Sequence, residues 1–395
     1  MSEDQPCKQN RSQPSLPGHG IGALYVHVPF CLRKCHYCDF YSLRAHPDPM
    51  QRYVQSALGE LALKAPRLVA PLASVFVGGG TPTVLGGQLL AKLLSALGPL
   101  VGSDTEFTVE ANPGTLDETV VAVLVSSGVN RVSLGVQSFN EDELQSLGRV
   151  HSAHQARQAV MSLREAGIDN INLDLIYGIP GQTPQSWNAT LGEALELQPE
   201  HLSCYALSIE PGTPLERQVQ AGKQHEMDET LQKQCYCAAI AASRRAGLRH
   251  YEISNFAQPP RQCRHNLTYW HNLPYLGIGP AAVSYVDGAR AKTLLDLERY
   301  IQVDRSGRVF PADEERITGR ALLAETMMLE LRLVQGIDRA AFKARFGVDA
   351  VEAFSAPLRR YELQGALVVS PSHIRLDPSV LFCADTILAD IIAEA

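Results

Sequence analysis

The stretch Cys31-Leu-Arg-Lys-Cys35-His-Tyr-Cys38 directly follows the short apolar run Ala23-Leu-Tyr-Val-His-Val-Pro-Phe30. It gathers three of the nine cysteines into one loop, which is rarely a chance arrangement. Closely spaced thiolates hold iron–sulfur clusters, usually with four ligands, but here position 40 is Phe40 and no fourth cysteine follows. The loop therefore predicts a [4Fe–4S] cluster with one open iron, and an open metal site indicates chemistry rather than a structural role. Three unconnected thiols, or a zinc site that lacks one ligand, are the alternatives.

The spacing Cys31-x3-Cys35-x2-Cys38, with an aromatic residue before the last cysteine, resembles the cluster loop of the radical S-adenosylmethionine (SAM) superfamily. In that superfamily the open iron is bound by the amino and carboxylate groups of SAM. An electron from the cluster then cleaves SAM to a 5′-deoxyadenosyl radical. The resemblance implies that this chain has two cofactors, a [4Fe–4S] cluster and SAM, and that it needs an electron donor.

The composition is that of an ordinary globular protein, with an apolar share of 45% and a charged share of 19%. The 395 residues are enough for one large α/β domain and a smaller one. A net charge of −7, without a long basic block, argues against a general nucleic-acid binder. No uninterrupted apolar run approaches the roughly 18 residues of a membrane span, so no integral membrane segment is expected.

The N-terminal stretch is polar, carries Pro14 and Pro17, and lacks the apolar core of a secretory signal. Residues 1–20 are therefore expected to form a disordered tail. Cysteines without a secretory signal indicate a reducing compartment, where metal binding is more common than disulfide formation. A cytoplasmic location is expected.

From residue 23 onward, short β-branched runs alternate with amphipathic helical stretches, which is the pattern of βα units around a parallel sheet. The expected strands are Leu24–Val28, Ser74–Val77, Glu106–Glu110, Arg131–Val136, Asn172–Ile176 and Leu202–Ser208. The expected helices cover residues 49–65, 87–98, 116–127, 153–166, 185–197 and 228–246, with a capping box at Thr115–Glu118 and helix stops at Gly128 and Gly167. These repeats predict an α/β fold with a partial, open (β/α)6 TIM-like barrel over residues 21–285.

Polar residues recur at the ends of successive expected strands. Side chains two positions apart share one face of a strand, and in a parallel barrel the reactive groups lie at the carboxyl ends. The residues that share a face are Thr108 with Glu110, Ser133 with Gly135 and Gln137, and Asn172 with Asp174. A purely structural strand would carry Val or Leu at these positions, so the pattern predicts a barrel mouth lined for a polar ligand. An ordinary sheet with these side chains facing solvent is the alternative.

The second expected strand runs into Gly78-Gly-Gly-Thr-Pro-Thr83. Glycines let the backbone approach a ligand and leave amides free to bind a carboxylate or phosphate, although a plain tight turn has the same composition. The segment resembles the glycine-rich segment of the radical SAM superfamily, which contacts the methionyl part of SAM. Position by position, the resemblance implies a SAM pocket formed by Tyr25, Tyr37, Gly79, Gly80, Thr81, Glu110, Gln137, Arg149 and Asp174.

From about residue 22 to the C-terminus, the chain resembles the oxygen-independent coproporphyrinogen III dehydrogenases and their relatives. Dehydrogenases of that group carry a further cysteine at the position of Phe40. Because this chain lacks that cysteine, the resemblance disfavours porphyrinogen decarboxylation here. The segment His265-Asn-Leu-Thr-Tyr-Trp270 resembles the His-Asn-x-x-Tyr-Trp signature of the HemW-type haem chaperones. This resemblance implies a chaperone that binds haem and transfers it to haemoproteins such as respiratory enzymes. A radical SAM oxidoreductase acting on a tetrapyrrole is the alternative, so enzymatic turnover is left open.

Histidine is the usual proximal ligand of haem iron, and aromatic side chains suit the flat macrocycle. The predicted haem-binding residues, within segment 263–271, are His265, Tyr269 and Trp270, with Cys263 and His271 as second candidates for an iron ligand. A structural role is the alternative for a single histidine. The next stretch, Leu276–Ala282, is expected to be a tight loop that could close the barrel mouth.

Beyond about residue 290 the βα rhythm stops, and residues 290–395 are expected to form a smaller, mainly helical, winged-helix-like domain of the HemN C-terminal type. Its expected elements are helices at Glu314–Val334, Asp338–Phe346 and Asp349–Glu362, a hairpin at Ala366–Leu376 and a last helix from about residue 379. The acidic net charge argues against DNA binding by this domain. Four further cysteines, Cys204, Cys235, Cys237 and Cys383, are expected to be buried free thiols.

Overall fold

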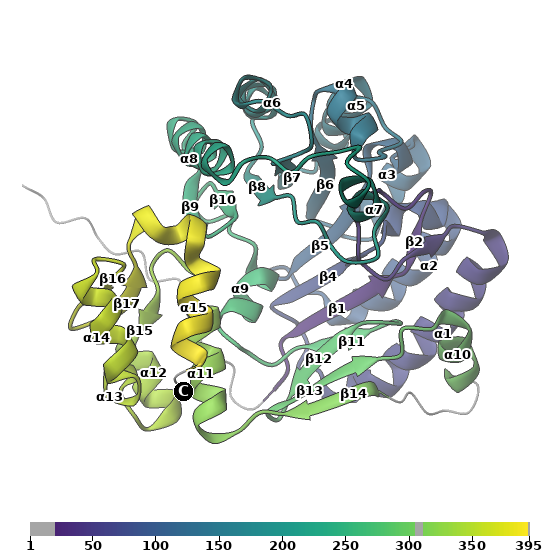
Figure 1. Cartoon of the computed structure of the whole chain (residues 1–395). Coiled ribbons are helices and arrows are strands. Elements are labelled where there is room, and N and C mark those ends of the chain that lie inside the picture. Colours follow the sequence, from purple (N-terminus) through teal and green to yellow (C-terminus); the bar gives the residue numbers. More distant parts are fainter. Residues whose placement is uncertain (1–19, 305–310, 394–395) are drawn as a thin grey trace, which may run out of the picture.

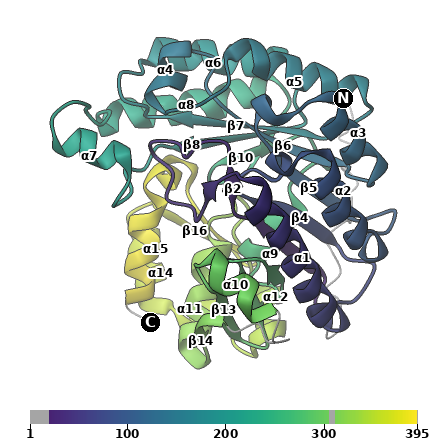
Figure 2. The ribbon, with the colours of Figure 1, turned by 90° about the vertical axis from the view of Figure 1, so that its right-hand side faces the viewer.

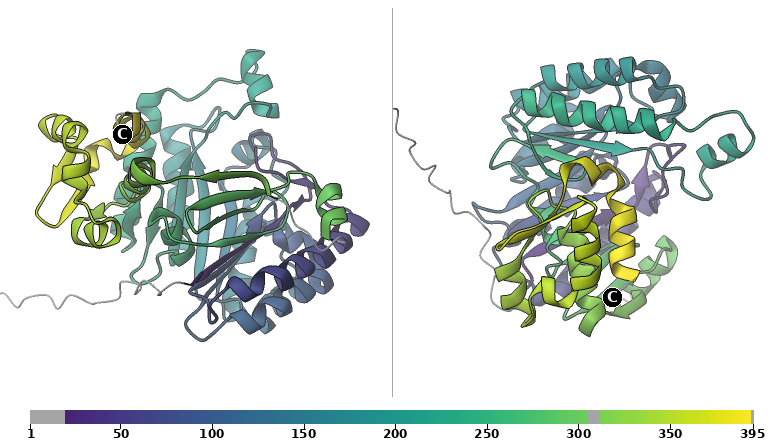
Figure 3. Two further views of the ribbon diagram at one scale, coloured as in Figure 1. Left: turned by 90° about the horizontal axis from the view of Figure 1, so that it is seen from below. Right: turned by 60° about the vertical axis from the view of Figure 1, so that its left-hand side comes forward.

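The computed structural model describes residues 20–304 and 311–393, so the tail expected at residues 1–20 lies outside the described residues except for Gly20. The described part has two units, an α/β unit built on one large sheet and a smaller, mostly helical C-terminal unit (Figure 1). In Figure 3 the C-terminal unit, coloured yellow-green, lies to one side of the large sheet.

The large sheet has the strand order β11-β1-β4-β5-β6-β7-β8-β10-β9. Its parallel strands are β1 (Ala23–Val28), β4 (Ser74–Gly79), β5 (Glu106–Ala111), β6 (Arg131–Gln137), β7 (Ile171–Tyr177), β8 (His201–Ala206) and the edge strand β11 (Leu276–Ile278). At the other edge, β10 (Asn255–Ala257) and β9 (Arg249–Glu252) add in antiparallel fashion. The sheet therefore has two edges, which confirms the predicted open, partial barrel.

Helices cover the outer face of the sheet (Figure 2). They are α1 (Pro47–Lys64), α2 (Gly86–Leu97), α3 (Glu118–Ser126), α5 (Ala153–Glu165), α6 (Pro184–Glu196) and α8 (Glu229–Arg245), with the shorter α4 (Glu141–Ser146) and α7 (Pro214–Gln220) in the connections. The strands turn apolar residues toward them, such as Val75 and Val77 of β4 and Leu173 and Leu175 of β7, all fully buried. Each such side chain stabilises the fold by roughly 1.5–3 kcal/mol.

The opposite face of the strands lines the barrel interior and carries polar side chains. Thr108, Ser133 and Asn172 are 0%, 6% and 2% exposed. Buried polar groups need hydrogen-bond partners, and Asn172 Nδ2 donates to Ser133 Oγ at 2.7 Å. The alternative that these side chains face solvent is therefore wrong.

Local signals set most helix boundaries. Gly128 and Gly167 follow α3 and α5 with φ angles of 78° and 87°, which confirms the predicted helix stops. The predicted capping box at Thr115–Glu118 is wrong. Asp117 is the N-cap of α3, and its carboxylate accepts a hydrogen bond from a backbone N–H of the first turn. Thr115 instead ends a short 3-10 turn before that helix.

By length and composition alone, the helical stretch Pro82–Leu100 could cross a membrane, with 19 residues and a mean hydropathy of 1.3. It contains α2, whose Leu90, Leu93, Leu94 and Leu97 are buried. In the fold, α2 lies against α1 and α3 on the outer face of the sheet (Figure 2). Packing against the sheet and the neighbouring helices therefore accounts for the apolar face of α2.

Two short regions connect the sheet with the C-terminal unit. The first is α9 (Arg264–Trp270), which packs against β4 and against α11 (Gly319–Glu330) between the two units (Figure 1). The second is an antiparallel sheet of β12 (Val283–Val286), β13 (Ala289–Thr293) and β14 (Pro311–Arg316), with α10 (Leu297–Asp304) packed on α1.

Two predictions for this region are wrong. The loop expected at Leu276–Ala282 begins as β11, because Leu276 to Ile278 pair in register with β1. The single helix expected at Glu314–Val334 is divided, because Glu314 to Arg316 pair with β13 and the helix begins only at Gly319.

The C-terminal unit contains α11, α12 (Arg339–Phe346), α13 (Ala350–Ala353), α14 (Ser355–Leu363) and α15 (Ala384–Ala393), and a sheet of β15 (Ile337–Asp338), β17 (His373–Leu376) and β16 (Leu367–Val369). The predicted hairpin is confirmed as β16 and β17. The helix expected at Asp349–Glu362 is broken at the buried Phe354, whose φ and ψ of −127° and 38° are not helical. The last helix begins at Ala384 because residues 378–383 form a 3-10 turn.

Candidate metal and cofactor site

The three clustered cysteines follow the carboxyl end of β1. Their loop begins in a two-stranded pair of β2 (Phe30–Cys31) with β3 (Leu43–Arg44). Ala45 N–H donates to the carbonyl oxygen of Cys31 at 2.8 Å, and His36 N–H donates to the carbonyl oxygen of Leu147 at 2.9 Å. Backbone groups therefore fix both the start and the middle of the loop, which leaves the thiols free to bind.

The thiols lie among hydrogen-bond donors. Cys31 Sγ accepts from Thr81 Oγ1 at 3.7 Å, and Cys35 Sγ accepts from Arg149 Nη1 at 3.4 Å. Burial raises the pKa of the Cys31 thiol and raises the pKa of Cys38 to about 11, whereas metal coordination deprotonates a thiol outright. Among the described residues, no three Cys, His, Asp or Glu side chains are placed to share a single metal ion. A [4Fe–4S] cluster does not need several side chains on one metal ion, because each of its cysteines binds a different iron. The three thiols and their hydrogen-bond donors therefore fit such a cluster.

The glycine segment at the end of β4 lies directly beside the cysteine loop. Gly79 has a φ angle of 108°, and its N–H donates to Glu110 Oε2 at 2.9 Å. A Cβ atom at Gly80 would lie 2.5 Å from the carbonyl oxygen of Phe30, just before Cys31. The two backbones touch so closely that a side chain at this position has no room.

Replacing Gly80 with alanine is expected to destabilise the protein by about 1–3 kcal/mol, because the new methyl group overlaps backbone atoms. We also expect less cluster after reconstitution, because the overlap displaces the start of the cysteine loop. Denaturant unfolding and iron content measure the two effects. Gly192→Ala in α6 is the matched control, because a Cβ atom there meets nothing within 4 Å. Equal stability and iron content in the two variants would contradict the close contact at Gly80.

An open pocket of about 450 Å³ extends from the cysteines into the barrel mouth. Its lining contains the three clustered cysteines and, among the predicted SAM residues, Tyr37, Gly79, Gly80, Thr81, Glu110, Gln137, Arg149 and Asp174. Tyr25 is not part of the lining. It lies deeper on β1, with its hydroxyl 3.1 Å from His27 Nδ1 and its ring centroid 6.2 Å from that of Phe76. The fold thus gathers every predicted SAM residue except Tyr25 around one pocket with the cysteines.

Two features of the pocket do not follow from the strand pattern considered above. Arg149 lies in the loop after α4, yet its guanidinium reaches the pocket and donates from Nη2 to the carbonyl oxygen of Gly135 at 2.6 Å. Tyr205 also lines the pocket and was missed. In β8, His201 and Ser203 share the inward face of the strand, and Tyr205, two positions further on, lies on the same face. Applying the two-residue alternation to this strand would therefore have identified Tyr205.

Two carboxyl groups, partly buried, face the pocket. Burial first, and then the charge of Asp174, raise the pKa of Glu110 to about 7. Burial also raises the pKa of Asp174, while hydrogen bonds from Ser133 Oγ and Asn172 Nδ2, both at 2.9 Å, favour its ionised form. Two carboxylates in one desolvated site favour a cationic ligand, and SAM carries sulfonium and ammonium groups. Arg149 offers the opposite charge for the carboxylate of such a ligand, so these residues fit SAM.

A chain of hydrogen bonds runs from Asp174 through the barrel interior to the start of α9. Asn172 Nδ2 donates to Asp174, and Asn172 Oδ1 is bonded to His201 Nδ1 at 2.6 Å. His201 Nε2 is bonded to the hydroxyl of Tyr251 at 2.8 Å, which accepts from the N–H of Cys263 at 3.3 Å. Burial holds the pKa of His201 well below its usual value, so its imidazole is neutral and one nitrogen accepts. Every donor can then point toward Asp174, and such chains strengthen each bond.

The predicted haem-binding residues lie at the other end of the barrel. His265 is 1% exposed, with Nδ1 bonded to Ser74 Oγ at 2.9 Å and Nε2 bonded to the hydroxyl of Tyr269 at 2.8 Å. Its ring stacks on Phe76 with 5.2 Å between centroids, and burial lowers its pKa to about 3. Ser74 begins β4, whereas the cysteines follow the carboxyl end of β1. The structure therefore does not bring the haem candidates to the SAM pocket.

The first turn of α9 is fixed to the sheet by Glu106 of β5. Its Oε1 accepts from the N–H of His265 at 3.1 Å and from the thiol of Cys263 at 3.6 Å. Trp270, at the other end of α9, faces the C-terminal unit, where the guanidinium of Arg332 lies 5.2 Å from its ring. The helix therefore connects the barrel interior with the C-terminal unit.

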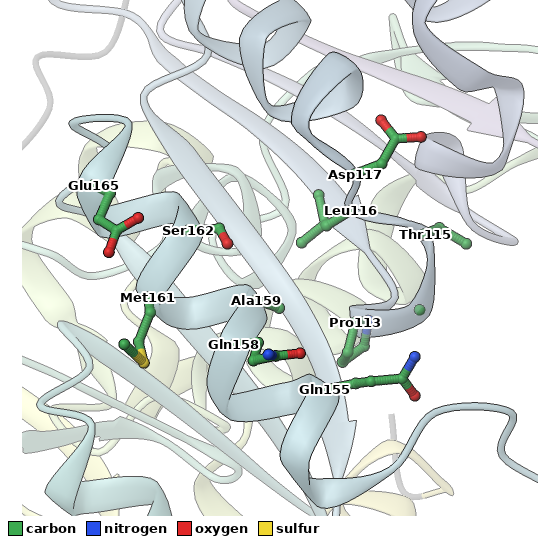
Figure 4. Close-up of a pocket in the computed structure, with 11 residues that line it drawn as sticks. Pro113, Thr115, Leu116, Asp117, Gln155, Gln158, Ala159, Met161, Ser162 and Glu165 are labelled. Atoms are coloured by element: carbon green, nitrogen blue, oxygen red, sulfur yellow. The ribbon is translucent and has the colours of Figure 1, made fainter.

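A second pocket of about 480 Å³ lies on the outer surface, between the turn before α3 and helix α5 (Figure 4). It is lined mainly by polar side chains, including Asp117, Gln155, Gln158 and Glu165. None of the predicted site residues lines this pocket, so we assign it no role.

The prediction for the four further cysteines is only partly right. Cys204 and Cys235 are buried free thiols, as predicted. Cys237 and Cys383 are exposed, so the prediction is wrong for them. Cys237 lies two positions after Cys235 on α8, and a helix cannot turn both positions toward the sheet.

An open βα barrel whose first strand leads into a three-cysteine loop is the architecture of a radical SAM protein, and the Radical SAM superfamily profile matches residues 25–194. The HemN C-terminal domain profile matches residues 317–380. The chain is 34% identical to the heme chaperone HemW of Bacillus subtilis over 357 residues, which cover 89% of this chain and 94% of the relative. The chain therefore belongs to the HemW family.

Two other relatives and one solved structure are also similar to this chain. The identity is 35% with the heme chaperone HemW of Escherichia coli, over 82% of this chain and 86% of the relative. It is 33% with the mitochondrial radical S-adenosyl methionine domain-containing protein 1 of Danio rerio, over 96% and 89%. The solved structure of coproporphyrinogen III oxidase (HemN) from Escherichia coli superimposes with a TM-score of 0.82 at 22% identity, over 95% of this chain and 91% of that one. That likeness confirms the fold alone.

Proposed function

We propose that this chain is a haem chaperone that carries a [4Fe–4S] cluster and SAM and transfers haem to recipient haemoproteins. The names of its HemW relatives support the haem part of the proposal. The observation that carries the cofactor part is the pocket, in which three thiols lie beside two carboxyl groups and one guanidinium. The proposed recipients are respiratory haemoproteins, and the proposed location is the cytoplasm. An external electron donor is proposed to supply electrons to the cluster.

Each pocket residue has a role in this proposal. Cys31, Cys35 and Cys38 would hold the cluster, which would supply an open iron for SAM and a source of one electron. The cationic groups of SAM lie near Glu110 and Asp174, where two negative charges would otherwise be desolvated together. The further SAM-binding residues are Tyr37, Gly79, Gly80, Thr81, Gln137 and Arg149, with Tyr25 supporting the pocket from the barrel interior.

The proposed haem-binding region is the segment 263–271 of the barrel domain, residues 21–285, next to the C-terminal domain, residues 290–395. His265, Tyr269 and Trp270 are its proposed members. Both ring nitrogens of His265 are engaged in hydrogen bonds in the described conformation. A direct bond from His265 to iron would therefore require one of these bonds to break.

The alternative function is a radical SAM oxidoreductase that acts on a tetrapyrrole. Phe40 favours the chaperone, because it places an exposed ring in the pocket lining at the position where the dehydrogenases that the chain resembles carry a further cysteine. The test is anaerobic reconstitution of the cluster, followed by incubation with SAM, a reductant and coproporphyrinogen III. We expect no accumulation of protoporphyrinogen IX and stoichiometric binding of haem. Protoporphyrinogen IX formed over many turnovers would replace the chaperone with the oxidoreductase.

A further inference from the structure

The segment at α9 contains three side chains that could bind haem iron, Cys263, His265 and His271. Their surroundings differ sharply. Cys263 is 0% exposed and its thiol points at the carboxylate of Glu106. His265 is 1% exposed and both of its ring nitrogens are hydrogen-bonded. Neither side chain can reach an external ligand without leaving its buried site and breaking at least one of these hydrogen bonds.

His271 follows the last turn of α9 and differs from both. Its side chain is 29% exposed. Nδ1 lies 3.4 Å from Oε1 of Glu330 on α11, and Nε2 makes no hydrogen bond to any residue within 20–304 or 311–393. One nitrogen thus faces a carboxylate while the other is open. Metal-binding histidines commonly show this arrangement, because the carboxylate fixes the tautomer and makes the ring a better ligand.

The backbone around His271 is held from both sides. Its N–H donates to the carbonyl oxygen of Leu267 within α9 at 2.9 Å, and its own carbonyl oxygen accepts from Arg345 Nη1 at 2.8 Å. The next residue, Asn272, has a φ angle of 48°, and its Nδ2 donates to Thr326 Oγ1 at 3.0 Å. The backbone that carries the imidazole is therefore held in place before any ligand arrives, which lowers the cost of binding.

We propose that Nε2 of His271 is the axial ligand that this segment offers to haem iron, with Glu330 holding the opposite nitrogen. His265 is then a positioning residue that anchors α9 to the barrel through Ser74 and Phe76. The proposal rests on the proposed function, because it names the iron ligand within the haem-binding segment. It places the iron at the border of the two units rather than inside the barrel.

The test adds hemin to the apo full-length chain and records absorption and electron paramagnetic resonance spectra. His271→Ala is expected to lose the spectrum of a histidine-bound iron and to bind hemin at least about 10-fold more weakly. Imidazole added to His271→Gly should restore the spectrum, because it can enter the space left by the ring. His373→Ala is the matched control, because this partly exposed histidine lies on β17.

Two further variants separate ligation from positioning. His265→Ala is expected to keep the histidine spectrum while unfolding more easily, because Ser74 and Tyr269 lose their buried partner. Glu330→Gln should weaken hemin binding by about 10-fold and raise the midpoint potential of the iron, because the ring donates less electron density. The conservative variant Glu330→Asp should recover part of both effects.

The outcomes are distinguishable. If the wild-type chain does not bind hemin, the proposed function itself fails. If the wild type binds but His271→Ala keeps the same affinity and spectrum, the ligand assignment is wrong and the proposed function stands. Loss of the spectrum in a folded His265→Ala variant would likewise transfer the assignment to His265. Failure of imidazole to rescue a folded His271→Gly variant would show that the lost binding came from altered packing.

Discussion

Replacing Cys38 with serine is expected to abolish the iron–sulfur cluster. Three cysteines line the pocket, so in the proposed cluster each would hold one iron, and the described pocket residues provide no substitute thiol. A serine hydroxyl ionises far less readily than a thiol and is a poor ligand for iron. We expect iron content to fall from about four atoms per chain to nearly none, together with the visible absorption of the cluster. SAM binding should weaken as well, because the open iron is lost.

The fold itself should survive this substitution, because backbone hydrogen bonds fix the loop independently of the thiols. Circular dichroism and thermal unfolding of the apo protein check this point. Cys383→Ser is the control, because this exposed cysteine lies in the C-terminal unit. A full cluster in Cys38→Ser would contradict the three-cysteine site, and an equal loss in Cys383→Ser would show a nonspecific defect.

Replacing Glu110 with glutamine is expected to weaken SAM binding by about 30-fold or more, because removing one partner of a buried charge pair costs roughly 2–5 kcal/mol. The pKa of Glu110 lies near 7 in the protein without SAM. Binding of a cation favours the ionised carboxylate, so the affinity of the wild type should rise from about pH 6 to about pH 8. Equilibrium dialysis of SAM across this range measures both effects, and the dependence on pH should be much weaker in Glu110→Gln.

The stability of the protein without SAM should change in the opposite direction. The folded-state pKa of Glu110 lies above its usual value, so the unfolded chain releases this proton first. Stability therefore falls as the pH rises from about 4.5 through about 7, and Glu110→Gln should lack this component. Glu165→Gln, on the outer surface, is the control. A flat affinity profile in the wild type would exclude Glu110 as the group that meets the cation.

The central fold could be predicted because strand and helix periods are local properties of the sequence. Two-residue alternation identified the inward faces of β5, β6 and β7, including Glu110 and Asp174. Glycines identified the helix ends at Gly128 and Gly167. The same local reasoning failed at Glu314–Val334, because pairing of its first residues with β13 is a long-range contact that a helical pattern does not reveal.

The contents of the candidate site were less predictable than its location. Arg149 reaches the thiols from a loop whose path depends on the packing of α4, so no periodicity marks it. The environment of His265 was equally hidden, since Ser74, which binds one of its ring nitrogens, lies far away in the sequence. A sequence motif identifies candidate ligand residues, but only the fold shows which of their atoms are not already engaged in hydrogen bonds and can bind a ligand.

The hydrogen-bond chain from Asp174 to Cys263 is a physical connection through which two binding sites can be coupled. It joins the pocket proposed for SAM to the helix proposed for haem, although the two lie at opposite ends of the barrel. Any factor by which bound SAM changes the affinity for haem must equal the factor by which haem changes the affinity for SAM. Asn172→Leu, which interrupts the chain at its second member, should bring both factors toward one together. Haem affinity measured with and without SAM, and SAM affinity measured with and without haem, should therefore give the same coupling free energy.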